Sequence, residues 1–177
     1  AARFCRLSGA RPVIGLDVAP ARLALLPKTP GYAAVDSSKK NPAEAVKELT
    51  KGRMADVAFE ITGNQNLIPG QFAVLKKQGR FVVLSSPRGP SNFDFHDLVN
   101  APSTTIIGAH QMSHPEHETP FNVWTKARNV ELFFDLVREG EFDLKPLISH
   151  RVPALKGDQA YRDLLADRSK AMGVVLE

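Results

Sequence analysis

Short apolar runs alternate with helix-like segments along the first two thirds of the chain, and this alternation constrains the fold most. The runs are Val13–Asp17, Asp56–Thr62, Arg80–Ser86 and Thr104–His110. Val13–Asp17 is almost continuously apolar, which is typical of a parallel strand buried on both faces. Strands that alternate with helices at this spacing indicate parallel βαβ units. We therefore predict an α/β protein built on a parallel sheet.

The remaining segments complete this pattern and then depart from it. A brief strand is expected at Ala33–Asp36, a short helical piece at Asp94–Val99, and helices at residues 1–10, Ala21–Leu26, Asn41–Lys51 and Asn64–Lys77. Residues 111–122 are polar and irregular. Beyond them the spacing predicts a helix over Val123–Glu139, with Val130, Phe133, Phe134 and Val137 on its buried side. A strand at Leu147–Val152, a helix at Ala154–Ala166 and a strand at Gly173–Leu176 follow.

Composition excludes several classes of protein. The chain has 177 residues, of which 43% are hydrophobic and 24% charged, as in ordinary globular proteins. A single cysteine, Cys5, excludes an internal disulfide framework and a zinc site with several cysteines. The net charge of +4 is scattered, so the pairs Lys39–Lys40 and Lys76–Lys77 indicate solvated faces rather than a nucleic-acid footprint. No apolar run is long enough to span a membrane, and the first residues lack the pattern of a secretory leader. We therefore expect a cytoplasmic protein.

The first apolar run ends in one acid, Asp17, and a helix-like segment with Arg22 follows it. In a dinucleotide-binding sheet an acid at this place accepts hydrogen bonds from the adenosine ribose hydroxyls. An ordinary solvated aspartate at a strand end is the alternative, and short motifs of this kind are weak evidence alone.

Four stretches in a fixed order resemble the medium-chain dehydrogenase/reductase family, the zinc-type alcohol and polyol dehydrogenases. They are LSGARPVIGLDVAPARL, ADVAFEITGN, GRFVVLSSPRG and PLISHRVP, the last followed by a helix and a GVVL ending. The resemblance implies a Rossmann-like doubly wound parallel sheet in residues 1–111. Residues 112–177 would be a C-terminal α+β segment that returns to the catalytic domain.

One part of the family pattern is absent from this sequence. The glycine-rich G-x-G-x-x-G turn lies roughly 20 residues before the ribose-binding acid, and counting back from Asp17 places it before Ala1. We therefore expect a chain that lacks the first strand and the glycine-rich loop, and that is a fragment, itself inactive, of a longer polypeptide. Without that central strand, the strands at Val13–Asp17 and Asp56–Thr62 would have no common neighbour, unless they pair directly.

The resemblance also implies cofactor contacts at the carboxyl ends of the strands, where open α/β sheets bind ligands. Asp17 would bind the adenosine ribose and, by its charge, favour NAD over NADP. Val18 would contact the adenine, and Arg22 would lie beside the same ribose or be a solvated helix charge. The remaining contacts would come from three later strand ends, which otherwise are simply turns: Ile61, Thr62 and Gly63; Leu84, Ser85 and Ser86; and Ala109, His110 and Gln111.

No metal site and no catalytic residue are assigned from this sequence. His110, His114 and His117 do not have the spacing of a standard zinc set, and no cysteine accompanies them. Zinc in the intact protein would be held by residues outside this chain, and no catalytic residue transfers from the family. The family's basic residue before the last strand has no match here, because Gly173 occupies that place and Lys170 lies three residues earlier.

These observations predict an NAD-dependent oxidoreductase that moves a hydride between an alcohol or polyol and the nicotinamide. Its partners would be a small alcohol or carbonyl substrate and a second copy of the chain, paired through the edge strand Thr104–His110, unless a loop covers that strand. No nucleic-acid or membrane partner is expected. A zinc-free enone or quinone reductase of the same family, a non-catalytic nucleotide-binding module and a truncated inactive gene product are the alternatives.

Overall fold

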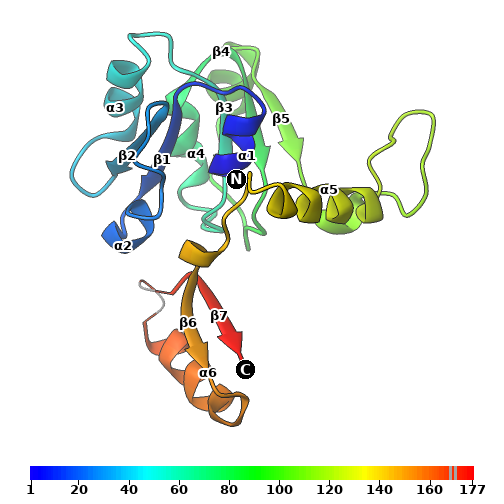
Figure 1. Ribbon diagram of the computed structural model, residues 1–177. Helices are drawn as coiled ribbons and strands as arrows, with labels where there is room; N and C mark the ends of the chain where they lie inside the picture. Colours follow the sequence, from blue (N-terminus) through cyan, green and yellow to red (C-terminus); the bar gives the residue numbers. More distant parts are fainter. Residues whose placement is uncertain (168, 170) are drawn as a thin grey trace. The chain divides into compact units, whose positions relative to one another are not determined.

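The computed structural model describes residues 1–167, 169 and 171–177, and in it the chain forms two compact units. Unit 1 comprises Ala1–Asn41 and Phe133–Glu177, and unit 2 comprises Pro42–Leu132. The described strands form three parallel sheets, each drawn as arrows in Figure 1. This confirms the predicted α/β class with parallel pairing.

Unit 2 contains a three-stranded parallel sheet in the order β3–β4–β5. The strands are β3 (Ala55–Glu60), β4 (Leu75–Val83) and β5 (Thr105–Gly108). The helical elements of this unit are α3 (Pro42–Leu49), α4 (Ile68–Gln71), η1 (Phe72–Val74), the π-helix η2 (His96–Asn100) and η3 (Gln111–Ser113). All three strands run in one direction, so their carboxyl ends lie at the same edge of this sheet.

The core of unit 2 lies where η1 packs against the sheet on one side and against α3 on the other. Ala45 and Val46 of α3 are buried, as are Phe72 of η1 and Phe81 of β4. The rings of Phe72 and Phe81 stack with their centroids 4.2 Å apart. Phe81 is only 1% exposed, so its burial anchors the middle strand of the sheet.

Two predicted elements of unit 2 differ from the structure. The helix expected over Asn64–Lys77 is confined to α4 and η1, and the strand expected at Arg80 already begins at Leu75. Leu75 pairs with Ala55, whereas Arg80 pairs with Val57, so β4 carries extra residues between these two pairs. Gly79 lies in this bulge, where a Cβ atom would come within 2.8 Å of the Lys76 carbonyl oxygen. The pairing with β3 therefore overrides the local helical pattern.

Unit 1 contains two separate two-stranded parallel sheets, β1–β2 and β6–β7. The strands are β1 (Val13–Asp17), β2 (Tyr32–Asp36), β6 (Ile148–Val152) and β7 (Gly173–Leu176). Its helical elements include α1 (Ala2–Leu7), α2 (Pro20–Leu23), η4 (Lys145–Leu147), η5 (Ala154–Lys156) and α6 (Gly157–Ala166). β1 pairs with β2 and β3 pairs with β4, so the direct pairing of β1 with β3 that was left open is not formed.

Helix α5 (Lys126–Arg138) begins later than the predicted Val123 and crosses from unit 2 into unit 1. The predicted buried stripe on this helix is wrong in part, because Val130 is 54% and Phe134 60% exposed. Phe133 is half-buried, and its ring lies 6.3 Å from that of the buried Phe142. Helical spacing places apolar residues on one face, but only a packing partner buries them.

Lys170, which we compared with a basic family position, lies outside the described residues. Among the described residues, no helix is both long enough and apolar enough to cross a membrane.

The burial of Phe81 predicts a large loss of stability on truncation. We expect Phe81→Ala to lower the free energy of unfolding by about 3–5 kcal/mol, because it removes a ring from a packed core. Phe121→Ala is the matched control, since Phe121 is 100% exposed. Urea denaturation followed by circular dichroism measures both variants, and equal losses for the two would contradict the assigned core.

Candidate functional site at the strand ends

The turns after β3 and β4 carry six of the residues predicted to contact a cofactor. Ile61, Thr62 and Gly63 follow β3, and Leu84, Ser85 and Ser86 follow β4. Ile61 is 60% and Leu84 44% exposed, so both turns present apolar side chains to the solvent. Gly63 has φ +73°, a conformation that residues with a Cβ atom rarely adopt. The two turns lie at one edge of one sheet, as the sequence predicted for this unit.

A buried carboxylate joins these two turns, and the sequence analysis did not single it out. Glu60, the last residue of β3, is 0% exposed. Its Oε1 accepts hydrogen bonds from Thr62 N at 2.7 Å, Thr62 Oγ1 at 2.5 Å and Gly63 N at 3.0 Å. Its Oε2 accepts a hydrogen bond from Ser85 Oγ. One carboxylate therefore holds three of the predicted contact residues.

The backbone of Glu60 strengthens the same junction. Its carbonyl oxygen accepts hydrogen bonds from Leu84 N at 3.1 Å and from Ser85 N at 3.0 Å. In the sequence Glu60 lies inside the predicted run Asp56–Thr62, so it lacks the signal of Asp17, an acid that ends its run. Only the strand pairing shows that β3 ends at Glu60.

The charge state of Glu60 follows from these contacts. Burial raises the pKa of its carboxyl, but hydrogen bonds from Ser85, Thr62 and Gly63 outweigh burial and hold the pKa below its ordinary value of 4.5. Glu60 is therefore an anion at neutral pH. A buried anion is tolerated here because each oxygen has a hydrogen-bond donor.

The turn after β5 adds the last three predicted contact residues. Ala109 N donates to Val83 O at 3.0 Å and extends the ladder with β4 past the end of the strand. His110 is the N-cap of η3, and its Nδ1 accepts a hydrogen bond from Met112 N at 3.3 Å. His110 and Gln111 are exposed. The structure thus places Ala109, His110 and Gln111 at the same edge of the sheet as Gly63 and Ser85.

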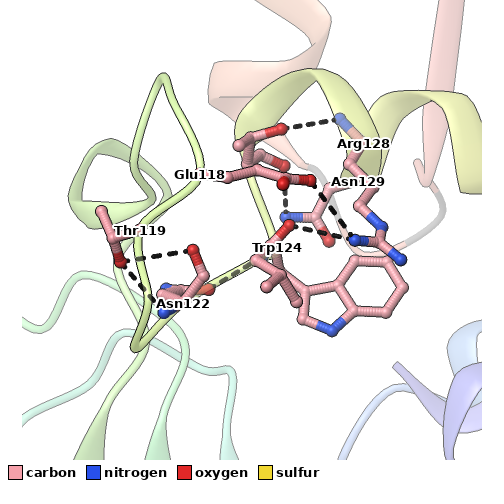
Figure 2. Close-up of polar contacts among 8 residues, drawn as sticks. Glu118, Thr119, Asn122, Trp124, Arg128 and Asn129 are labelled. Atoms are coloured by element: carbon pink, nitrogen blue, oxygen red, sulfur yellow. Dashed lines mark hydrogen bonds and ion pairs between the residues drawn. The ribbon is translucent and has the colours of Figure 1, made fainter.

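The segment between η3 and α5 has a structure defined by its own side chains (Figure 2). Thr119 and Asn122 form a tight turn, with Thr119 N 3.0 Å from Asn122 O and Asn122 N 3.0 Å from Thr119 Oγ1. Asn122 Oδ1 accepts a hydrogen bond from Trp124 N at 2.9 Å. The Arg128 guanidinium lies 4.6 Å from the Trp124 ring centroid and 3.6 Å from a carboxylate oxygen of Glu118. The irregular segment of the sequence is therefore a loop with hydrogen bonds among its own residues.

In unit 1, Asp17 and Asp36 end the two strands of the β1–β2 sheet and lie opposite each other in its register. Asp17 is half-buried, and its Oδ1 accepts a hydrogen bond from Ala19 N at 2.9 Å. Side-chain and backbone hydrogen bonds from Ser38 hold the pKa of Asp36 below its ordinary value. Lys39 Nζ lies 3.3 Å from Asp36 Oδ2, so the Asp36 carboxylate is also part of an ion pair.

Two further predicted contact residues follow Asp17 in unit 1. Val18 is 64% exposed, directly after β1. Arg22 is half-buried in α2, which begins with Pro20 at its first position. Both therefore lie on the segment that leaves the carboxyl end of β1.

The described part of the chain contains no group of three or more His, Cys, Asp or Glu side chains that could hold a metal ion. His114 and His117 are exposed in the loop after η3, and Cys5 is half-buried in α1. The described residues therefore do not fit a zinc ion, and no zinc chemistry is assigned to them.

The lowered pKa of Glu60 predicts a stability that depends on pH. The native state binds its proton less tightly than the unfolded chain, so the stabilisation is present above pH 4.5 and is lost as the pH falls through the native pKa. We expect Glu60→Gln to lower the free energy of unfolding by about 1–3 kcal/mol at neutral pH. The difference from the wild type should shrink below pH 4.5.

Chemical denaturation of both proteins at neutral and acid pH measures this difference. Asp56→Asn is the control, because Asp56 lies on the same strand and pairs with Lys76 at the surface, where ion pairs contribute little. A difference between the wild type and Glu60→Gln that is independent of pH would contradict an ionised Glu60.

Comparisons with known proteins agree with this geometry. A family model described as zinc-binding dehydrogenase matches residues 1–127. The L-threonine 3-dehydrogenase of Bacillus subtilis is 28% identical over 153 residues, which are 86% of this chain and 41% of that protein. The L-threonine 3-dehydrogenase of Coxiella burnetii is 29% identical over 168 residues, 95% of this chain and 45% of that protein.

Solved structures show the same fold. Benzyl alcohol dehydrogenase from Acinetobacter calcoaceticus has a TM-score of 0.78 at 21% identity, over 100% of this chain and 46% of that one. The chain thus spans less than half the length of the relatives it matches. The family resemblance inferred from the four sequence stretches is confirmed, and the match over residues 1–127 shows that the chain belongs to the zinc-binding dehydrogenase family.

Proposed function

We propose that the chain is the coenzyme-binding part of an NAD-dependent dehydrogenase, which transfers a hydride between an alcohol or polyol and the nicotinamide. The observation that carries the proposal is the family match over residues 1–127. The strand ends of unit 2 support it, because polar groups and an exposed glycine turn gather there at one edge of a parallel sheet. That edge is where open α/β folds bind their ligands.

In unit 1 the proposed contact is with the adenosine. Asp17 accepts hydrogen bonds from the ribose hydroxyls, with Val18 at the adenine and Arg22 beside the same ribose. Asp36 lies opposite Asp17 in the sheet register, and its carboxylate forms an ion pair with Lys39 at 3.3 Å. The Asp17 carboxylate would repel a 2′-phosphate, so it favours NAD over NADP.

In unit 2 the proposed contacts are with the nicotinamide half of the dinucleotide. The positive φ of Gly63 and the absence of a side chain there allow a close approach of ligand to backbone. When bound, NAD supplies the hydride chemistry, and the protein's residues bind and orient it. The proposed contact residues are Ile61, Thr62, Gly63, Leu84, Ser85, Ser86, Ala109, His110 and Gln111.

The whole protein would take a small alcohol or carbonyl substrate in the cytoplasm, without a nucleic-acid or membrane partner. Residues 1–111 would form the partial nucleotide-binding domain, and residues 112–177 would complete a catalytic domain. Any zinc ion of the whole protein would be held by residues outside this chain, since the described residues offer no ligand group.

Coenzyme preference tests the proposal. We expect NAD to bind the protein more tightly than NADP. Asp17→Asn should bring the two dissociation constants closer together, because the variant removes the negative charge. Calorimetric titration of both dinucleotides measures the two dissociation constants. Asp56→Asn is the matched control, since it removes an acid from the same kind of parallel strand.

Two outcomes would separate the alternatives. If neither dinucleotide binds, the proposal is wrong. If NAD binds and the intact native protein produces no NADH from alcohols, a non-catalytic nucleotide-binding module replaces the dehydrogenase.

The exposed edge of β5 supports a proposed homodimer. Within the sheet of unit 2, β5 has β4 on one side only, and its Ile106 and Ile107 are 43% and 38% exposed. An apolar edge strand without charge or proline readily pairs with another strand. The family resemblance favours the symmetry mate as that strand.

We expect Ile107→Lys to convert a dimer into monomers, because a charge would enter the paired edge. Light scattering measures the mass of each variant. Leu155→Lys is the control, since Leu155 is 99% exposed in η5. A monomeric wild-type protein would contradict pairing through β5.

A further inference from the structure

The Glu60 contacts determine which way the neighbouring hydroxyl groups point. An ionised carboxylate has no proton to donate and acts only as an acceptor. Thr62 Oγ1 and Ser85 Oγ therefore donate their protons to Glu60, through Oε1 and Oε2 respectively. Each hydroxyl has a single proton, so neither has another to donate to a ligand.

The two hydroxyl oxygens differ in how many of their lone pairs already accept a hydrogen bond. Thr62 Oγ1 also accepts a hydrogen bond from Asn64 N at 3.1 Å, which occupies one of its lone pairs. Within the part of the chain that the structure describes, no donor to Ser85 Oγ is found. Ser85 is half-buried at the end of β4, so its side chain is partly open to solvent.

A protonated Glu60 could donate its proton to a neighbouring hydroxyl oxygen, but two contacts disfavour the protonated state. The backbone N–H groups of Thr62 and Gly63 both donate to Oε1, at 2.7 and 3.0 Å. Backbone donors have a fixed direction and stabilise the ionised carboxylate. The reversal of the Ser85 hydroxyl would also need a proton on Oε2, which the ionised state lacks.

We propose that Glu60 is a positioning residue that makes Ser85 Oγ a hydrogen-bond acceptor, so that the end of β4 selects a neutral hydrogen-bond donor of the ligand. This rests on the proposed function, in which the ligand is NAD. A sugar hydroxyl and a carboxamide N–H share this donor chemistry. An anionic oxygen would meet the lone pairs of Ser85 Oγ next to the Glu60 charge and would be rejected.

A double-mutant cycle tests the proposal on the full 177-residue chain. NAD is titrated by calorimetry into the wild type, Glu60→Gln, Ser85→Ala and the double variant. In Glu60→Gln an amide group can donate to Ser85 Oγ and reverse the hydroxyl. We expect each single change to raise the dissociation constant about five-fold, which corresponds to one hydrogen bond.

The double variant gives the decisive comparison. Because Glu60 would act through Ser85, we expect its dissociation constant to match that of the weaker-binding single variant. The proposal would be overturned if the double variant raised the dissociation constant by the product of the two single effects. It would also be overturned if Glu60→Gln bound NAD as tightly as the wild type. Asp56→Asn should leave the dissociation constant unchanged, and thermal melting shows that each variant is folded at the titration temperature.

A second titration identifies the donor. ADP-ribose has the sugar hydroxyls of NAD and lacks the carboxamide. If Ser85→Ala weakens the binding of ADP-ribose as much as the binding of NAD, the donor is a sugar hydroxyl. If it weakens the binding of NAD alone, the donor is the carboxamide. If the variant weakens the binding of neither ligand, Ser85 does not accept a hydrogen bond from the ligand and the proposal is wrong.

A measurement without ligand separates this inference from the proposed function. The amide NMR signals of Thr62 and Gly63 should shift with pH in the wild type as Glu60 is protonated, and the shift should be absent in Glu60→Gln. Amide signals that do not shift with pH in the wild type would contradict the hydrogen bonds from Thr62 and Gly63 to the Glu60 carboxylate. Titrating signals in a protein that does not bind NAD would instead refute the proposed function, and the donor selection with it.

Discussion

The strand ends of unit 2 depend on one buried charge. Removing the Glu60 carboxylate from water is costly, and the cost is acceptable only because the neighbouring turns supply donors to both of its oxygens. The same contacts bind the turn after β3 to the turn after β4. The carboxylate therefore cross-links two loops that are far apart in the sequence, and such cross-links favour a defined geometry in a binding site.

The sheet below this edge is held by ordinary packing. Phe81 of β4 lies against Phe72 of η1, and Val46 of α3 is buried in the same unit. Parallel pairing aligns the carboxyl ends of β3, β4 and β5, so the residues of three separate segments meet at one edge. The apolar core thus positions the strand ends, and the fully buried Glu60 contributes the carboxylate that joins them.

Sequence patterns worked best where one physical signal dominated. The bounds predicted for Val13–Asp17 and Gly173–Leu176 are those of β1 and β7, because each is a short apolar run between turn residues. The helix predicted over Asn64–Lys77 was too long, since the pairing of Leu75 with Ala55 outweighs local helical spacing. The exposure of Val130 and Phe134 has a related cause, because periodicity defines a face and not its partner.

The sequence by itself determined the class of fold, the parallel strands and the family, since these follow from local apolar runs and an ordered set of motifs. It also located the turns Ile61–Gly63 and Leu84–Ser86. Only the tertiary structure decided that Glu60 joins them and that Ser85 Oγ donates to it. The physical reason is that a hydrogen bond between residues 25 positions apart depends on strand register, which no local pattern contains.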